Sequence, residues 1–411
     1  MRRTELAAAA RELGSRLGRL ARISDEAGAT TRTFLSPAMR RANAAVGSWM
    51  REAGLSVRED PAGNLVGRME GPRGSGTLVL GSHLDTVRDA GRFDGPLGVL
   101  LPLAALQVLK SRGPVLPFCI EVVGFSEEEG VRFSSAYLGS KGYIGRLSKA
   151  DLGLRDADGV SVAQALKAAS LPRSTRGRTR TGFLGYLEVH IEQGPVLESE
   201  GLAAGVVSAV AGQTRARVSF TGKAGHAGTT PMRLRRDALA GAAEFVLACE
   251  ALARRTPGLV ATVGRIEVRP GSTNVIPAGA ELSLDVRHPG DTARRRALRR
   301  LRGLGAAIAR RRRLRFQMRA TQDNGSVPCA PSLTRRLRKS VRRVQGRSID
   351  LPSGAGHDGV VLSSAMDIAM LFVRCRGGLS HHPDEHVSGA DLRTALDIVV
   401  DFLAALAAEN R

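Results

Sequence analysis

The sequence TLVLG at residues 77–81 is followed by PLGVLLPLAALQVLKS at 96–111 and by FCIEVVGF at 118–125. The first and third segments are short apolar runs typical of buried strands, and the second is long enough for a helix. A strand, a helix and a second strand in this order indicate a parallel pair joined by a helical crossover. We therefore predict an α/β fold with a mixed, mostly parallel sheet.

The pattern changes near residue 212. From there the chain reads as strand, helix, strand, strand, helix and strand, which predicts a compact α+β insert with helices near 233–255 and 292–313. The α/β pattern returns with IAMLFVRC at 368–375 and an amphipathic helix at 391–409. We expect a discontinuous main domain, residues 1–212 and 328–411, interrupted by a smaller domain at 213–327.

The composition fits a globular chain with an uneven charge. The 411 residues are 43% hydrophobic, which suffices for about two domains, and 61 − 39 gives a net charge of +22. A basic chain can bind nucleic acid, but 4% aromatic residues offer little for base stacking. In the arginine-rich segment 292–316, Leu298, Leu301, Leu304 and Ile308 follow helical spacing. This spacing predicts a solvated helix with one apolar stripe on a sheet, and we expect no nucleic-acid partner.

The sequence gives no sign of secretion or of membrane insertion. The four cysteines, Cys119, Cys249, Cys329 and Cys375, are far apart, and no CxxC motif is present. No run of 18 or more uncharged apolar residues occurs, and the N-terminal residues lack the apolar stretch of a secretory signal. We expect a cytoplasmic protein with no membrane contact.

Candidate metal ligands recur where strand-like runs end. His83 follows TLVL, Asp94 lies in a Gly-rich turn before the first helix, and SEEEG follows FCIEVVGF. His190 and His381 also end or follow such runs. Nitrogen and carboxylate ligands together suit Zn, Mn, Co or Ni. Five ligands are too many for one open catalytic zinc, whereas two metals bridged by a carboxylate would fit.

Each of these residues also has an ordinary structural interpretation. A histidine at a strand end is commonly a hydrogen-bonded core or surface residue, and an acidic triplet or a Gly-flanked Asp is commonly part of a turn. The recurrence of five such residues in one α/β pattern nevertheless favours a metal site. We interpret three further histidines, His288, His382 and His386, as structural.

Nine motifs in order resemble one family over nearly the whole chain: GSHLDTV, GRFDGPLGV, EEEGVRF, EVHIEQGPVLE, GHAGTTPM, GSTNVIP, DVRH, SGAGHD and GGLSHHPDE. The chain resembles the dinuclear-metal amidohydrolases of the aminoacylase and carboxypeptidase superfamily. Within it, the branch of allantoate amidohydrolase and N-carbamoyl-L-amino acid hydrolase is the most similar. The resemblance implies a metal-binding α/β domain with an inserted domain for lid closure and homodimer formation.

The resemblance also implies the metal ligands and the base. His83, Asp94 and His190 would hold one divalent ion, and Asp94, Glu129 and His381 the other, with Mn or Zn favoured over Co or Ni. Asp85 would be the carboxylate that orients the His83 imidazole. Glu128 would be the general base, and Glu127 has no assigned role.

Further residues would bind the substrate. The resemblance implies that His226 stabilises the transition state in the partner subunit's site, and that Asn274 and Arg287 bind the substrate carboxylate. Gln193, His357 and the backbone at Gly354 and Ala355 would complete the pocket.

The expected reaction is hydrolysis of a ureido C–N bond in a small ureido acid, most of all allantoate. Gly225 stands before His226 where some bacterial allantoate enzymes carry Asn. N-carbamoyl-L-amino acid hydrolase and β-ureidopropionase therefore stay open as alternatives. An ordinary peptidase and a catalytically silent basic binding protein are the remaining ones.

Overall fold

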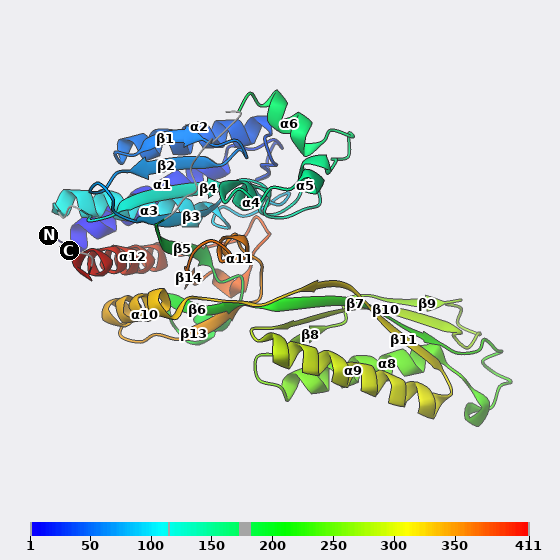
Figure 1. Ribbon diagram of the computed structural model, residues 1–411. Coiled ribbons are helices and arrows are strands. Elements are labelled where there is room, and N and C mark those ends of the chain that lie inside the picture. Colours follow the sequence, from blue (N-terminus) through cyan, green and yellow to red (C-terminus); the bar gives the residue numbers. More distant parts are fainter. Residues whose placement is uncertain (1, 114–115, 172–181, 410–411) are drawn as a thin grey trace. The chain divides into compact units, whose positions relative to one another are not determined.

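The structure is a computed structural model that describes residues 2–113, 116–171 and 182–409 (Figure 1). The chain forms two compact units. Unit 1 comprises Met1–Ser208, Cys329–Leu351 and Gly356–Arg411, and unit 2 comprises Ala209–Pro328 and Pro352–Ala355. The catalytic and lid roles expected for the two domains stay predictions.

The larger sheet has nine strands within the described residues, in the order β1-β2-β4-β3-β5-β14-β6-β12, with β13 paired to β6. The four central strands, β4, β3, β5 and β14, are parallel. Strands β1, β2, β6 and β12 pair antiparallel with their neighbours. The predicted α/β class with a mostly parallel central sheet is confirmed. The bounds are β1 Ser56–Glu59, β2 Leu65–Met69, β3 Thr77–His83, β4 Cys119–Phe125, β5 Phe183–Ile191, β6 Ala204–Val210, β12 Val327–Pro328, β13 Asp350–Ser353 and β14 Ile368–Val373.

Helix α3 (Pro96–Arg112) connects two of the central strands and is apolar on every side. Proline at its first turn and Gly113 after its end, with a φ of 86°, bound it in the usual way. It packs on β3, β4 and β5 and also against α1 and α12, which explains why no polar face is needed. The remaining helices of unit 1 are α1 Arg2–Ala21, α2 Pro37–Glu52, α4 Leu138–Tyr143, α5 Lys149–Gly153, α6 Val162–Ala168, α7 Val196–Ser199, α10 Pro331–Gln345, α11 Gly359–Leu362, η2 Arg376–Gly378 and α12 Gly389–Glu409.

Unit 2 contains an antiparallel sheet of five strands within the described residues, in the order β11-β7-β10-β8, with β9 also paired to β10. Alternate residues of β7 are buried, because helices α8 and α9 pack on that face. The segment LVATVGRIEVRP, which reads as one strand, forms two. Thr262 pairs with Asp285 but Ile266 pairs with Leu282, so one extra residue makes a bulge. The bounds are β7 Gly212–Thr221, η1 Met232–Leu234, α8 Ala238–Arg254, β8 Val260–Thr262, β9 Ile266–Arg269, β10 Gly279–His288, α9 Asp291–Arg312 and β11 Arg315–Asn324.

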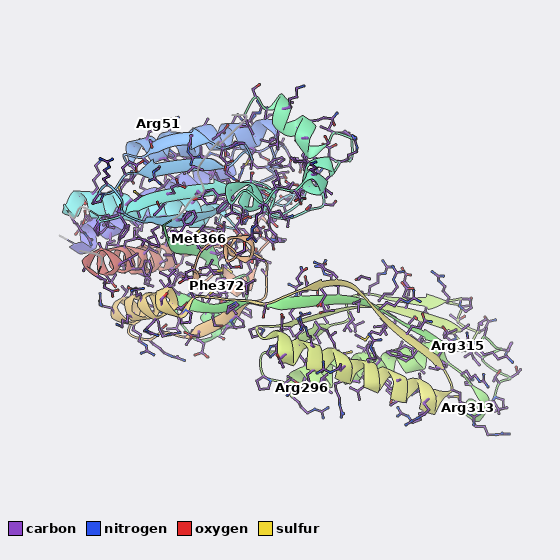
Figure 2. The ribbon with its side chains drawn as sticks, viewed as in Figure 1. Arg51, Arg296, Arg313, Arg315, Met366 and Phe372 are labelled. Carbon is purple, nitrogen blue, oxygen red and sulfur yellow. The ribbon has the colours of Figure 1, made fainter. Side chains whose placement is uncertain are left out.

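The arginine-rich helix α9 has the predicted apolar stripe. Leu301 and Ile308 are buried in the core of unit 2, and Leu298 and Leu304 are partly buried against it. Most arginines of this segment are exposed, as Figure 2 shows for Arg296. Among the helices of the described residues, none combines the length and apolar composition needed to cross a bilayer.

Candidate metal centre

The carboxyl ends of the central strands carry two predicted ligands. His83 is the last residue of β3, and His190 is the last but one of β5. Neighbouring parallel strands end at the same edge of a sheet, so such side chains can meet there. Asp94 lies in the turn before α3. The next residue, Gly95, has a φ of 82°, and a Cβ there would lie 2.5 Å from the His83 ring. Glycine therefore lets this turn approach His83.

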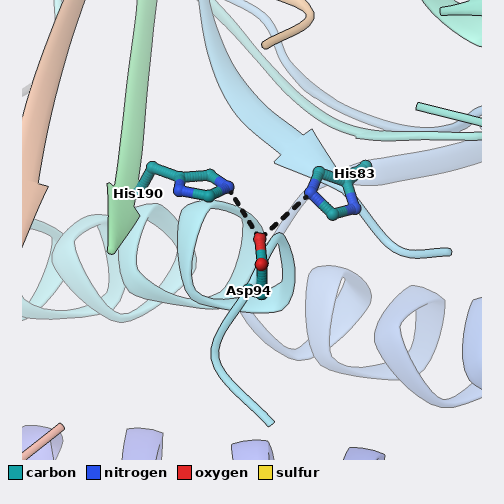
Figure 3. Close-up of side chains that lie close together, drawn as sticks. All are labelled: His83, Asp94 and His190. Carbon is teal, nitrogen blue, oxygen red and sulfur yellow. Dashed lines mark ion pairs between the residues drawn. The ribbon is translucent and has the colours of Figure 1, made fainter. Parts of the chain in front are cut away.

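Three imidazoles surround the Asp94 carboxylate. His190 Nε2 lies 3.0 Å and His83 Nε2 3.5 Å from Asp94 Oδ1 (Figure 3). His381 Nε2 lies 3.3 Å from the other oxygen, Oδ2, and 3.4 Å from Glu129 Oε1. The five side chains predicted as ligands thus lie together, and the two Asp94 oxygens face different imidazoles. Their atoms form two groups that could each hold an ion, and both groups include Asp94.

The hydrogen bonds of the His83 and His190 imidazoles are those expected of histidines that bind a cation together with Asp94. His83 Nδ1 lies 2.9 Å from the Asp85 carbonyl oxygen, and His190 Nδ1 lies 2.9 Å from the Ile191 carbonyl oxygen. A carbonyl oxygen can only accept a hydrogen bond, so Nδ1 of each ring must carry the hydrogen. In the neutral imidazole Nε2 then carries a lone pair. That lone pair faces the Asp94 carboxylate, which is also an acceptor. A bound cation would satisfy both groups, and carbonyl anchoring of Nδ1 is usual for metal-binding histidines.

The electrostatics of the cluster also favour a cation. Burial opposes charge on Asp94, but the surrounding His190, His381 and His83 hold its pKa well below the usual range. Burial and neighbouring carboxylates raise the pKa of Glu128 well above its usual value. Burial also raises the pKa of Glu129. Buried carboxylates so close together ionise easily only when positive charge compensates them.

The three consecutive glutamates have different environments. Glu127 is fully buried with a φ of 51°, and its Oε1 accepts hydrogen bonds of 2.9 Å from the backbone N–H groups of Arg132 and Phe133. It therefore closes the turn after β4. Glu128 and Glu129 share a potential ion group with His83.

The position of Asp85 differs from the expectation. Its carboxylate Oδ1 lies 3.9 Å from His83 Nδ1, beyond hydrogen-bond distance, and its main-chain carbonyl binds the imidazole instead. The carboxylate accepts the backbone N–H groups of Glu128 and Glu129, each at 3.2 Å. The side chain of Asp85 thus holds the acidic turn, because those two amides point at it.

A further layer of side chains fixes Asp94, and the sequence suggested none of them for this role. Glu385 is buried, and its Oε1 accepts the backbone N–H of Phe93 at 2.7 Å and of Asp94 at 3.1 Å. The Ser380 hydroxyl donates to Asp94 Oδ2 at 2.6 Å, and Gln193 Nε2 donates to the same oxygen at 2.9 Å. Gln193, predicted to bind substrate, thus directs its amide nitrogen at Asp94.

A second buried acid cluster lies beside His190. Glu188, His190 and His357 form another group that could hold an ion, and the rings of His190 and His357 are 4.5 Å apart. Ser82 donates to Glu188 Oε1 at 2.9 Å, and Asp358 is fully buried. Glu188 was missed, although its spacing of two residues from His190 on one strand places both on the same face.

The remaining predicted residues lie in unit 2. His226 and Asn274 are exposed, and the backbone N–H of Ala227 donates to the Asn274 carbonyl at 2.9 Å. His226 Nδ1 accepts the backbone N–H of Gly228 at 3.1 Å. Arg287 Nη1 donates to the Gly354 carbonyl at 2.6 Å. Ala355 accepts from the Ser353 hydroxyl through its carbonyl at 3.0 Å.

This sheet edge defines the class of the protein. An α/β chain that places imidazoles and carboxylates around a shared aspartate, at the carboxyl edge of parallel strands, is built as a metal-dependent hydrolase.

The chain belongs to the peptidase family M20/M25/M40, which residues 79–405 match. Enzymes of this family are metal-dependent. An Arabidopsis thaliana relative named allantoate deiminase is 39% identical, covering 95% of this chain and 81% of its own. A Geobacillus stearothermophilus relative named N-carbamoyl-L-amino acid amidohydrolase is 40% identical, covering 94% and 96%. The crystal structure of an amidase of the hydantoinase/carbamoylase family from Burkholderia multivorans has a TM-score of 0.90 and 32% identity, covering 97% and 98%. The resemblance seen in the motifs is confirmed.

Proposed function

We propose that the chain is an amidohydrolase that cleaves a ureido C–N bond in a small ureido acid, with allantoate as the preferred substrate. Ammonia and carbon dioxide are the eventual products. The observation that carries this proposal is the Asp94 carboxylate with three imidazole Nε2 atoms at 3.0–3.5 Å, in a chain of this family. Relatives named for allantoate and for N-carbamoyl amino acids support a carbamoyl C–N bond as the target.

N-carbamoyl-L-amino acids are the second candidate substrates, because the relative with that name is 40% identical, against 39% for the allantoate deiminase. β-Ureidopropionate is the third. A peptidase with the same centre would hydrolyse dipeptides instead. A silent basic binding protein is disfavoured, since every predicted ligand position holds a side chain able to bind a metal.

The cofactor we infer is a pair of divalent ions, with Mn or Zn before Co or Ni. His83, Asp94 and His190 would hold one ion, and Asp94, Glu129 and His381 the other. When bound, such ions supply Lewis-acid chemistry toward a carbonyl group and toward water.

Glu128 is the general base of this proposal. It is only 7% exposed, and the hydrogen bond from its backbone to Asp85 fixes the turn that carries it. A carboxylate here takes the proton from the attacking water and delivers it to the leaving nitrogen. Asp85 acts on Glu128 and Glu129 through their backbone, as a positioning residue.

Unit 2 supplies groups for the substrate in this scheme. His226 Nδ1 accepts a backbone hydrogen, so in the neutral ring Nε2 carries the hydrogen and can donate to developing negative charge. Asn274 and Arg287 bind the substrate carboxylate, beside the backbone of Gly354 and Ala355.

We also infer that two residues of unit 1 bind the substrate. Gln193 Oε1 is buried without a hydrogen-bond partner among the described residues, so it is available to a substrate N–H. His357 is buried beside His190, and burial holds its pKa well below the usual value, so it can act as a neutral imidazole.

We also propose that residues 213–327 form a lid and dimerisation domain between the parts 1–212 and 328–411 of a catalytic domain. Leu239 and Leu247 on α8 are 37% and 66% exposed, and Val260 on β8 is 58% exposed. Strand β8 lies at the edge of its sheet. Exposed apolar side chains beside a free strand edge support contact with a second copy of the chain.

An ammonia-release assay tests the reaction. Allantoate, several N-carbamoyl-L-amino acids, β-ureidopropionate and a dipeptide are compared with Mn, Co, Ni and Zn supplied in turn. Turnover of allantoate above the other substrates is expected. Turnover of the dipeptide alone, or of no substrate with any metal, would contradict the proposal.

Sedimentation velocity tests the dimer, with Leu247→Asp expected to give monomers and Val196→Asp, an exposed apolar site of unit 1, serving as the control. Monomeric wild-type protein would overturn the proposed dimer.

We place the protein in the cytoplasm, which the four free, buried cysteines support. Fractionation of the source cells checks this location.

A further inference from the structure

Arg287 is already engaged on one edge of its guanidinium group. Its Nε donates to Asp285 Oδ1 at 2.8 Å, and its Nη2 donates to Asp285 Oδ2 at 3.0 Å. Its Nη1 donates to the carbonyl of Gly354 at 2.6 Å. All three residues belong to unit 2. The guanidinium plane is thus fixed from two sides before any ligand arrives.

The engaged edge determines which donors stay available. A guanidinium has five N–H donors. Three are used here, which leaves one hydrogen on Nη1 and one on Nη2 without a partner among the described residues. The Nη2 hydrogen lies on the terminal edge of the group, away from Asp285. Arg287 can therefore bind a carboxylate without releasing Asp285.

Asp285 is itself held by two neighbours on the same sheet face. Gln213 Nε2 donates to Asp285 Oδ2 at 2.7 Å, and Arg215 Nε donates to it at 3.2 Å. The strand register sets this arrangement, because Arg287 pairs with Gln213 and Asp285 pairs with Arg215. Although burial acts in the opposite direction, these hydrogen bonds and the charge of Arg287 lower the pKa of Asp285. The carboxylate is therefore an ionised acceptor that is held by three donor side chains.

We propose that Asp285 is a positioning residue that presents the terminal edge of Arg287 to the carboxylate of the substrate. The inference rests on the proposed function, in which Arg287 binds that carboxylate. Without this support, the long side chain of Arg287 would sample many rotamers and would lose that conformational entropy when it binds a carboxylate. By holding Arg287 in place, Asp285 contributes to the preference for substrates that carry a carboxylate.

An ordinary surface ion pair is the competing explanation, and the same sheet face supplies a matched control. Arg217 Nε lies 3.1 Å from Glu281 Oε1 on the same two strands, β7 and β10. Exposed pairs of this kind contribute little. If Asp285 only stabilised the sheet, its loss and the loss of Glu281 would have similar consequences.

The experiment compares wild type, Asp285→Asn and Glu281→Gln on the ureido acid that the wild type hydrolyses best, allantoate or an N-carbamoyl amino acid, and on the carboxamide of that acid, which lacks the carboxylate. Asp285→Asn should raise KM for the acid about 10-fold to 100-fold, with kcat and metal content unchanged. Its KM for the carboxamide should stay within about twofold of wild type, and Glu281→Gln should change neither substrate. Asp285→Glu, which shifts the carboxylate by one methylene, is the second variant and should raise KM for the acid by a smaller factor.

An equal change for acid and carboxamide, or no change in KM for the acid, would overturn the inference while leaving the proposed function intact. A wild-type protein that hydrolyses no ureido acid would instead overturn the proposed function, and the inference with it. Thermal melting shows whether each variant is folded. If Asp285→Asn is unfolded, the acid and the carboxamide are compared with Asp285→Glu instead.

Discussion

Replacing Glu385 by alanine should weaken metal binding although no predicted ligand is removed. Glu385 is 1% exposed, and its Oε1 accepts the backbone N–H groups of Phe93 and Asp94 at 2.7 and 3.1 Å. These two bonds fix the turn that holds the Asp94 carboxylate among three imidazoles. Without the carboxylate, these two N–H groups bind water or stay unpaired, and the turn can move.

The magnitude follows from the two bonds. Burial and the nearby Asp94 raise the pKa of Glu385 to about 7, so the acceptor is charged above that pH. There each hydrogen bond to a charged acceptor contributes about 1.5–3 kcal/mol, and the pair contributes roughly 3–6 kcal/mol to the local structure. Relaxation of the turn recovers part of this free energy both with and without metal, so only the difference between the two states changes the metal affinity. We expect this difference to be roughly 1.4–2.8 kcal/mol, which lowers the affinity about 10-fold to 100-fold, as for other side chains that orient ligands. Glu385→Gln keeps an acceptor oxygen and should stay within about threefold of wild type.

A competition titration of Zn²⁺ or Mn²⁺ against a chelating indicator measures this affinity. The control is Asp156→Ala, because Asp156 Oδ1 also accepts two backbone N–H groups, of Asp158 at 3.1 Å and Val160 at 2.9 Å, but contacts none of the predicted ligands. Equal metal affinity in Glu385→Ala, Asp156→Ala and wild type, all folded by urea titration, would refute the reasoning.

Three further predictions concern the centre and its proposed partners. His83→Ala should abolish one metal site and Asp94→Ala both, because Asp94 belongs to both ligand groups; elemental analysis with full metal content in Asp94→Ala would disprove sharing. Glu128→Gln should keep its metals and lose turnover, whereas Glu129→Gln should lose about one ion per chain, and the reverse result would move the base by one residue. His226→Ala should lower kcat with metal content intact, and mixing it with Glu128→Gln should restore activity if His226 acts in the partner's site. Absence of recovery after proven subunit exchange would place His226 in the site of its own chain.

The sequence predicted the parts of the fold that depend on local pattern. The apolar runs and the helix between them give β3, α3 and β4 within a few residues, because buried parallel strands need continuous apolar sequence. The bulge between β8 and β9 was missed, since its cause is the register against β10 and not the composition of the segment. The apolar pattern of the sequence thus predicts that a strand or helix is present, whereas the pairing with a neighbouring strand determines whether a strand is continuous.

The same distinction applies to the candidate centre. Histidines at strand ends were predictable, because the sheet itself brings strand ends together. Glu385 was not, because it lies 292 residues from Phe93 in the sequence and its contact depends on two loops. The carboxylate of Asp85 was predicted to hold an imidazole, but the direction of a loop side chain depends on the backbone amides within reach, and those of Glu128 and Glu129 are closer.

The net charge is the poorest guide to the centre. The chain carries +22, yet Asp85, Asp94, Glu127, Glu128 and Glu188 are all less than a tenth exposed. Exposed arginines are screened by water and salt over about 8–10 Å, so their charge cannot compensate carboxylates inside the protein. Compensation must come from groups in contact with the carboxylates, and at Asp94 these are the three imidazoles and the ions they are suited to hold. The arginine excess and the metal centre are therefore separate features, and the position of the acids at the strand ends, not their number, carries the information about function.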